Sequence, residues 1–299
     1  MKTLKNRRFL VPQNSETKKN FKVFVIGDFH GKFPIKLKKI AKRKDIDLVV
    51  SVGDYCPFSL RKEFFKYIYR KHDREIWEFI GKKKVKEKTL QDLKQGEKIL
   101  KEINKSKVPV FTITGNLDYA KWPDLYDRKT KIKWGWAEQD FFGRVIKKYK
   151  NIKVFDYSYI KFNGFVFIGV ARSTFPGKVK SKNYRKYKSK LDNLFRKFKK
   201  EKIILVSHNV PYGKLDGIKT KEIDKKLKRK HYGSKLARRL IDKYQPILTL
   251  AGHMHENPGK AKLGKTIVIN PGAAVDGKAA IVEIDEIKGK VKNVRFIKS

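Results

Sequence analysis

Four apolar residues lead directly into an aspartate and a histidine in Val23-Phe24-Val25-Ile26-Gly27-Asp28-Phe29-His30. A short apolar run that ends at glycine and polar residues is typical of a strand buried on both faces of a parallel sheet. In open α/β sheets, binding sites form beyond the carboxyl ends of such strands. We therefore expect Asp28 and His30 at one edge of a sheet, within a functional site.

The same arrangement recurs four more times along the chain. The other copies are Leu48–Val52 before Gly53-Asp54, Val110–Thr114 before Gly115-Asn116-Leu117-Asp118, Ile203–Ser207 before His208, and Pro246–Leu250 before Ala251-Gly252-His253-Met254-His255. One histidine at a strand end is usually structural, and one Gly-Asp pair is usually a turn. Five such blocks, each after its own predicted strand, favour a shared site. The predicted ligands are Asp28, His30, Asp54, Asn116, His208, His253 and His255.

Carboxylate, imidazole and amide ligands together suit divalent Mn, Fe, Ni, Zn or Co. Seven ligands are too many for one tetrahedral zinc ion, but they suit two ions that share one carboxylate. On extended chain, Asp28 and His30 point the same way, as do His253 and His255, so each pair can bind one site. Two ions about 3.5–4 Å apart, bridged by a carboxylate and a hydroxide, promote in-line displacement at phosphorus. The pattern therefore indicates phosphoester hydrolysis.

In the order of these blocks, the sequence resembles the calcineurin-like metallophosphoesterase superfamily. The pattern of that family runs Asp-x-His, Gly-Asp, Gly-Asn-His-Asp/Glu, His and Gly-His-x-His, and the resemblance spans residues 22–275. It implies that Asp28, His30 and His255 hold one metal ion, that Asn116, His208 and His253 hold the other, and that Asp54 bridges them. It also implies a four-layer α/β/β/α sandwich of two mixed sheets, although the strand count alone also allows one large sheet.

The third block departs from the family at Leu117, where the usual histidine donates a proton or binds phosphate. A missing general acid commonly costs about 10²–10⁴ in rate, most of all with poor leaving groups. We therefore expect phosphodiesters or activated esters to be cleaved better than alkyl monoesters. The candidates that replace this histidine are Asp118, Tyr119, His231 and a metal-bound water. Arg172 follows a predicted strand and is a candidate for phosphate binding.

The net charge of +45 indicates a polyanionic partner such as nucleic acid, or a general enrichment in lysine. Most of the 75 basic residues are lysines, and they are spread along the whole chain. An alternative function is therefore a nucleic-acid-binding protein whose metal site is structural or vestigial. A protein-interaction scaffold is a third interpretation, but its expected signature, the loss of ligand residues, is absent from the sequence.

The spread of the ligand blocks along the 299 residues favours one domain. We expect a basic N-terminal tail at residues 1–20 and a single domain at residues 21–299, with a helical insertion at about residues 57–107. A single cysteine excludes an internal disulfide and fits a reducing cytoplasm, and no apolar run is long enough to span a membrane.

Several further elements are predicted from local pattern. Helices are expected at residues 34–44, 60–80 and 89–104, with a break at Gly81. Strands at 152–156 and 164–170, with a hairpin turn at Asn163-Gly164, are expected to begin the second sheet. Ser234 is predicted to cap a helix. The loop at residues 119–136 is rich in aromatic side chains, which either stack on exposed bases or pack against the sheet. They are Tyr119, Trp122, Tyr126, Trp134 and Trp136.

Overall fold

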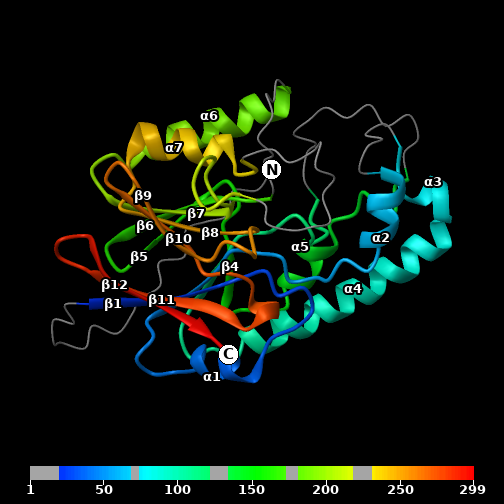
Figure 1. The fold of residues 1–299 in the computed structure, drawn as a ribbon, viewed down its shortest axis with the longest axis horizontal. Helices are drawn as coiled ribbons and strands as arrows, with labels where there is room; N and C mark the ends of the chain where they lie inside the picture. The colour runs from blue at the N-terminus through cyan, green and yellow to red at the C-terminus, as the bar shows by residue number, and fades with distance from the viewer. Residues whose placement is uncertain (1–19, 69–73, 122–133, 173–180, 218–230) are drawn as a thin grey trace.

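The computed structural model describes residues 20–68, 74–121, 134–172, 181–217 and 231–299 (Figure 1). Its strands are β1 Asn20–Ile26, β2 Leu48–Ser51, β3 Val110–Thr112, β4 Ile152–Val154, β5 Tyr159–Phe162, β6 Phe165–Val170, β7 Lys202–Asn209, β8 Leu248–Gly252, β9 Gly259–Leu263, β10 Thr266–Asn270, β11 Lys278–Asp285 and β12 Lys290–Lys298. Within these residues they form two six-stranded sheets, ordered β12-β11-β1-β2-β3-β4 and β5-β6-β7-β8-β10-β9.

Both sheets are parallel at their centres; the second is antiparallel at both margins, and the first is antiparallel only at its β1-β11-β12 margin. In the first sheet β1 pairs in parallel with β2, with Val23 opposite Leu48, and β2 pairs in parallel with β3. In the second, β6, β7, β8 and β10 are parallel to one another. Every residue of β2, β3, β6 and β8 is buried. Burial on both faces explains why these strands are continuous apolar runs in the sequence.

The two sheets pack face to face through a core of aromatic and branched side chains. The rings of Phe21 and Phe165 stack with centroids 5.4 Å apart, and Phe111 meets Phe167 edge-on at 5.5 Å. Outside the first sheet lie α1 (Ile35–Ile40), α4 (Lys82–Ile103) and α5 (Phe141–Ile146), and outside the second lie α6 (Lys182–Lys197) and α7 (Lys235–Tyr244) (Figure 1). This arrangement confirms the four-layer α/β/β/α sandwich.

The predicted start of the second sheet is partly wrong. Residues 152–154 form β4, which pairs in parallel with β3 in the first sheet, with Ile152 opposite Val110. The second sheet begins at β5, which was not predicted from the sequence pattern. The predicted turn is confirmed, because Asn163 and Gly164 connect β5 to β6 with φ values of 50° and 72°. Positive φ at both central residues is the geometry that an Asn-Gly hairpin turn supplies.

The helices between β2 and β3 differ from their predicted bounds. The helix predicted for residues 60–80 is divided into α2 (Arg61–Glu63), a π-helical turn at Phe64–Ile68 and α3 (Trp77–Ile80). Gly81 breaks the chain as predicted, with a φ of 83°. The following helix, α4, begins at Lys82 rather than near residue 89, because lysine-rich chain has high helix propensity. The helix predicted for residues 34–44 is also shorter, since α1 ends at Ile40.

Some predictions concern residues that the structure does not describe, namely the tail at 1–19 and the aromatic residues Trp122 and Tyr126. The described part of the aromatic loop packs within the protein, because Trp134 contacts Trp136 at 4.9 Å and Trp77 of α3 at 6.0 Å between ring centroids. In the described residues, the helices are all too short or too polar to cross a bilayer.

Candidate metal centre

Five loops at one edge of the sandwich bring the predicted ligands together. The first sheet supplies Asp28 and His30 after β1, Asp54 after β2 and Asn116 after β3. The second supplies His208 near the end of β7, and His253 and His255 after β8. Two groups result, each with donor atoms that lie within 4.8 Å of one another, namely Asp28, His30 and His255, and Asp54, His208 and His253. Each group combines side chains from both sheets.

Short distances connect the donor atoms within each group. In the first, Nε2 of His255 lies 3.0 Å from Nε2 of His30 and 3.5 Å from Oδ1 of Asp28. In the second, Nε2 of His208 lies 3.4 Å from Oδ2 of Asp54 and 3.2 Å from Nδ1 of His253. The amide oxygen of Asn116 lies 2.8 Å from the same nitrogen of His208 and so joins the second group.

The donor set fits divalent cations. Oδ1 of Asp28 is buried without a hydrogen-bond partner in the structure, and a buried acceptor in that state is costly unless a cation or water satisfies it. Imidazole nitrogens also face each other at 3.0 and 3.2 Å, where a shared cation would satisfy both lone pairs. Mixed nitrogen and oxygen donors of this kind bind Mn, Fe, Ni, Zn or Co. The residues present therefore fit the two ions that the sequence predicted.

The two histidines of the second group differ in protonation, and a cation bound there would displace the proton from Nε2 of His208. Burial, reinforced by the charge of His208, lowers the pKa of His253 to about 3, which keeps its imidazole neutral. Burial opposes the charged form of His208, but the Asp54 carboxylate outweighs it and raises the pKa of His208 to about 9. Nδ1 of His208 donates to the carbonyl of Val52 at 2.8 Å, which directs Nε2 into the site. Such an outer contact fixes the orientation of a metal-binding histidine.

The backbone at the ligands is not extended, contrary to the expectation from spacing. Asp28, His30, Asp54 and His253 all have positive φ, between 44° and 70°. The left-handed region costs a non-glycine residue about 1–3 kcal/mol, and such residues cluster at functional sites. Neighbouring loops hold the conformation, since Asp28 N donates to Gly53 O at 2.8 Å and His253 N donates to Oδ2 of Asp28 at 3.0 Å. The paired ligands converge through these turns.

Asp118 lies beneath the site rather than in its opening. Its side chain is fully buried, and its oxygens accept the backbone N–H groups of Asp54 at 2.9 Å, Tyr55 at 2.6 Å and Gly115 at 2.7 Å. Burial and the nearby Asp54 charge raise the pKa of Asp118 to about 7. This geometry positions the two loops that carry Asp54 and Asn116, a function that the sequence did not suggest.

Three other predicted residues occupy different places. Tyr119 is turned to the helical layer, where its hydroxyl donates to Oδ2 of Asp92 at 3.0 Å. Arg172 follows β6, and its backbone N–H donates to the carbonyl of Thr114 at 2.8 Å, which places it beside the Asn116 loop. Leu117 contributes its backbone N–H, which donates to Oδ1 of Asp54 at 2.8 Å.

His231 lies at a cavity of about 430 Å³ beside the site. Its Nδ1 is 2.9 Å from Oδ1 of Asp216, a buried residue that no sequence pattern singled out. One wall of the cavity is Glu256–Pro258, which directly follows His255. Asn270 supports that wall, because its side-chain amide donates to the carbonyls of Met254 and Asn257, both at 2.8 Å.

Comparison with known proteins agrees with this geometry. Residues 17–294 match the family model described as metallophosphoesterase, calcineurin superfamily. The chain therefore belongs to the calcineurin superfamily of metallophosphoesterases, which hydrolyse phosphoric esters with two divalent metal ions.

Similar individual proteins add information about the fold. The uncharacterized protein MJ1162 of Methanocaldococcus jannaschii is 34% identical over 107 residues, which are 34% of this chain and 46% of that protein. One solved crystal structure has a TM-score of 0.66 at 22% identity, covering 93% of this chain and 99% of its own. The crystal structure of TT1561 from Thermus thermophilus has a TM-score of 0.51 at 14% identity, and the match covers 92% of this chain and 98% of TT1561. These structures share the fold.

Proposed function

We propose that this protein is a phosphodiesterase whose two divalent ions are held by the seven converging ligands. Asp28, His30 and His255 would bind one ion, Asn116, His208 and His253 the other, and Asp54 would bridge them. The observation that carries the proposal is the pairing of two three-residue donor groups, each built from both sheets, at a single edge of the sandwich.

The side chains of the site have distinct functions in this proposal. Two divalent ions bound there supply a water-derived nucleophile at neutral pH and neutralise charge on the phosphoryl oxygens. His208 is oriented by the Val52 carbonyl, and Asp54 is oriented by the N–H of Leu117. Asp118 holds the loops of both groups in place through its three backbone contacts. Arg172, whose backbone lies beside the Asn116 loop, would bind a phosphate oxygen in this proposal.

A diester preference is supported by Leu117, because its side chain has no proton to give to a leaving group. A diester with an aryl leaving group needs little protonation, whereas an alkyl monoester needs more. We expect higher initial rates on an aryl phosphodiester than on an alkyl phosphomonoester under the same conditions. A preference for the monoester would contradict this specificity but not the hydrolase assignment.

The experiment that tests the function is a substrate panel run with Mn, Ni, Zn and Mg after removal of bound metal. The panel contains aryl diesters, nucleotides, cyclic nucleotides, DNA and RNA. Asp54→Asn removes the charge between the two groups and is expected to abolish turnover. Glu201→Gln, at an exposed residue paired with Lys161, is the matched control and is expected to keep full activity. Turnover that persists in Asp54→Asn would overturn the proposal.

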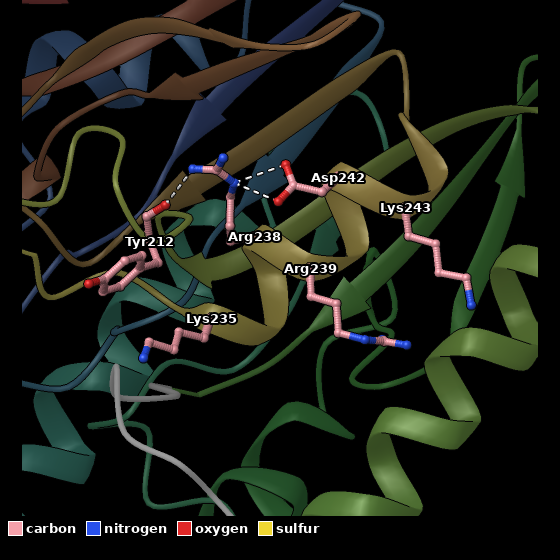
Figure 2. Close-up of a pocket in the computed structure, with 6 residues that line it drawn as sticks. All are labelled: Tyr212, Lys235, Arg238, Arg239, Asp242 and Lys243. Carbon is pink, nitrogen blue, oxygen red and sulfur yellow. Dashed lines mark hydrogen bonds and ion pairs between the residues drawn. The ribbon is translucent and has the colours of Figure 1, made fainter.

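A second candidate function, nucleic-acid binding, is favoured by the charge of the outer helices. Basic side chains exposed on α6 are Lys182, Arg185, Lys186, Lys190, Arg196 and Lys197. Beside them, α7 borders a shallow hollow of about 450 Å³ (Figure 2). Asp242 and the Tyr212 carbonyl hold Arg238 there (Figure 2). The exposed Lys235 and Lys243 lie with Nζ 5.1 Å from the Tyr212 ring centroid and 5.2 Å from the Tyr244 ring centroid. Lysines of this kind neutralise phosphates and release counterions.

Charge variants distinguish this surface from a general enrichment in lysine. We expect Lys235→Gln/Lys243→Gln to weaken binding to double-stranded DNA and to reduce the dependence of the binding constant on salt. The control pair Lys288→Gln/Lys290→Gln removes the same charge at the exposed β11–β12 turn. An equal loss of DNA affinity in both double variants would show that the positive charge of the protein binds DNA without a dedicated surface.

A further inference from the structure

We propose that His231, oriented by Asp216, donates the proton to the leaving group during phosphodiester hydrolysis. This inference rests on the proposed function and supplies the general acid that Leu117 cannot provide. It concerns a histidine and a carboxylate that lie outside both metal-binding groups and line the cavity beside them.

The contacts of Asp216 fix the orientation of the imidazole. Asp216 is 2% exposed, and its Oδ2 accepts the backbone N–H groups of Gly213 at 2.8 Å and Gly233 at 3.0 Å. Its Oδ1 is 2.9 Å from Nδ1 of His231, and because a carboxylate only accepts, that nitrogen carries the hydrogen. The Tyr212 ring packs at 5.1 Å against the imidazole. Nε2 is therefore the nitrogen that remains for a substrate.

The cavity is lined by segments that follow one ligand of each metal-binding group along the chain. The segment after His208 leads into Gly213–Gly217 on one wall, and the segment after His255 forms the opposite wall. The volume of about 430 Å³ lies within the range of small-molecule sites. The side chain of His231 is 29% exposed, so a bound molecule can reach it.

The charges of the cavity favour a leaving alcohol over a phosphate. Asp216 and Glu256 both line it, and two carboxylates repel a phosphate group. Glu256 and Asn257 instead offer acceptors to the hydroxyl groups of a polar alcohol such as a sugar. The phosphorus would then lie at the metal-binding groups and the leaving alcohol in the cavity, next to His231.

The proton balance of the step is simple. An oxygen derived from water forms a new bond to phosphorus, and the bond from phosphorus to the ester oxygen breaks with its electron pair on that oxygen. His231 enters the step with a proton on each ring nitrogen: the ester oxygen takes the one on Nε2, the one on Nδ1 stays with Asp216, and the alcohol leaves neutral. The imidazole then regains a proton from solvent, so one water is consumed per ester cleaved.

His231→Gln tests the inference, because glutamine keeps a polar side chain but is not an acid. We expect kcat on a dinucleotide, which has an alkoxide leaving group, to fall by about 10²-fold or more. On bis(4-nitrophenyl) phosphate, whose leaving group needs no proton, we expect a change of less than about threefold. Lys260→Gln, at an exposed residue of β9 near the cavity, is the control and should change neither rate.

Each other outcome overturns the inference in a recognisable way. Equal losses on both substrates would mean a structural role, and a raised KM with unchanged kcat would mean a binding role. Unchanged rates on both would place the acid elsewhere. Asp216→Asn is a second variant. We expect it to lower kcat on the dinucleotide more than on the nitrophenyl diester, as His231→Gln does, but by a smaller factor. Failure of the proposed function itself would show separately, as absence of Asp54-dependent turnover of the nitrophenyl diester by the unmodified protein.

Discussion

Two glycines at the metal centre let the loops after β2 and β3 approach one another. Gly53 has a φ of 95°, and a Cβ atom added there would lie 2.3 Å from the backbone nitrogen of Gly115. We expect Gly53→Ala to lower the free energy of unfolding by more than about 2 kcal/mol, because it combines backbone strain with a clash against backbone. Denaturant unfolding measures this. Gly135→Ala, where a Cβ meets nothing within 4 Å, is the control, and equal stability of the two variants would contradict the argument.

Asp156 makes stability depend on pH. Burial raises the pKa of its carboxyl from 3.8 to about 7, against hydrogen bonds from Thr114 N at 2.8 Å and Thr114 Oγ1 at 3.0 Å. The folded state therefore binds the proton more tightly than the unfolded state. The stabilisation that comes from this tighter proton binding is fully present below about pH 4, and it is lost as the pH rises to about 7.

We expect Asp156→Asn, which mimics the protonated carboxyl, to stabilise the protein at pH 7 more than at pH 5. The titration of this residue changes the free energy of unfolding by at most about 1.4 kcal/mol per pH unit. Urea unfolding of the metal-free variant at pH 5 and pH 7 measures this difference. The unmodified protein, unfolded under the same conditions, is the reference, because it contains the same titrating histidines. A variant with the same pH dependence as the unmodified protein would rule out this titration.

For single residues, the sequence indicated the candidate metal ligands. It did not indicate the residues and the backbone conformation that hold those ligands in position. Asp28, Asp54 and His208 were recognisable because each ends or follows a buried apolar strand. Asp216 gave no signal, because its partner His231 is fifteen residues away along the chain. The left-handed backbone of Asp28 and His253 was also hidden, because it is imposed by contacts between loops from different strands.

Among the elements, α4 is connected to the loops of the site through Asp92. This buried carboxylate accepts Ser59 N at 3.0 Å, the Ser59 hydroxyl and the Tyr119 hydroxyl at 3.0 Å. Ser59 follows the Asp54 loop, and Tyr119 follows Asp118. The helix therefore fixes both loops from behind, although it contributes no ligand.

We expect Asp92→Ala to cost about 3 kcal/mol of stability, because it leaves buried donors without an acceptor. We also expect weaker metal binding by the folded variant, since the loops that carry Asp54 and Asn116 lose their support. Thermal unfolding and calorimetric titration with Mn measure the two effects. Glu87→Ala, on the exposed face of α4, should change neither, and an Asp92→Ala variant with normal metal affinity would limit Asp92 to a stabilising role.

Burial explains why the strands of the sheet centres were predicted and the margin strand β9 was not. The strands of the two sheet centres were found because burial on both faces leaves a continuous apolar run. The margin strand β9, Gly259–Leu263, has mostly exposed or half-buried residues and two lysines, so no such run marks it. For β4 the strand was found but its sheet was not, because pairing with β3 depends on the path taken by α5, and that path has no local signature.

For the whole molecule, the candidate metal centre takes its side chains from both sheets. Asp28 and His30 extend from the first sheet to His255 of the second, and Asp54 extends from the first sheet to His208 and His253 of the second. In the structure, the buried carboxylates of Asp28 and Asp54 lie beside His255 and His208 of the second sheet. Bound ions would add further bonds that cross the interface between the sheets.

Metal removal should consequently destabilise the complete fold and not only the loops. Binding one ion to the folded state alone, at a free concentration one hundred times its Kd, adds about 2.7 kcal/mol to the free energy of unfolding. We expect a single thermal transition that moves upward by several degrees on addition of Mn and returns on chelation. In Asp54→Asn the upward shift should be much smaller, and in Glu201→Gln it should be unchanged. If calorimetry detects bound Mn while the transition of the unmodified protein stays in place, the ions do not join the sheets, and the centre is a surface feature of one of them.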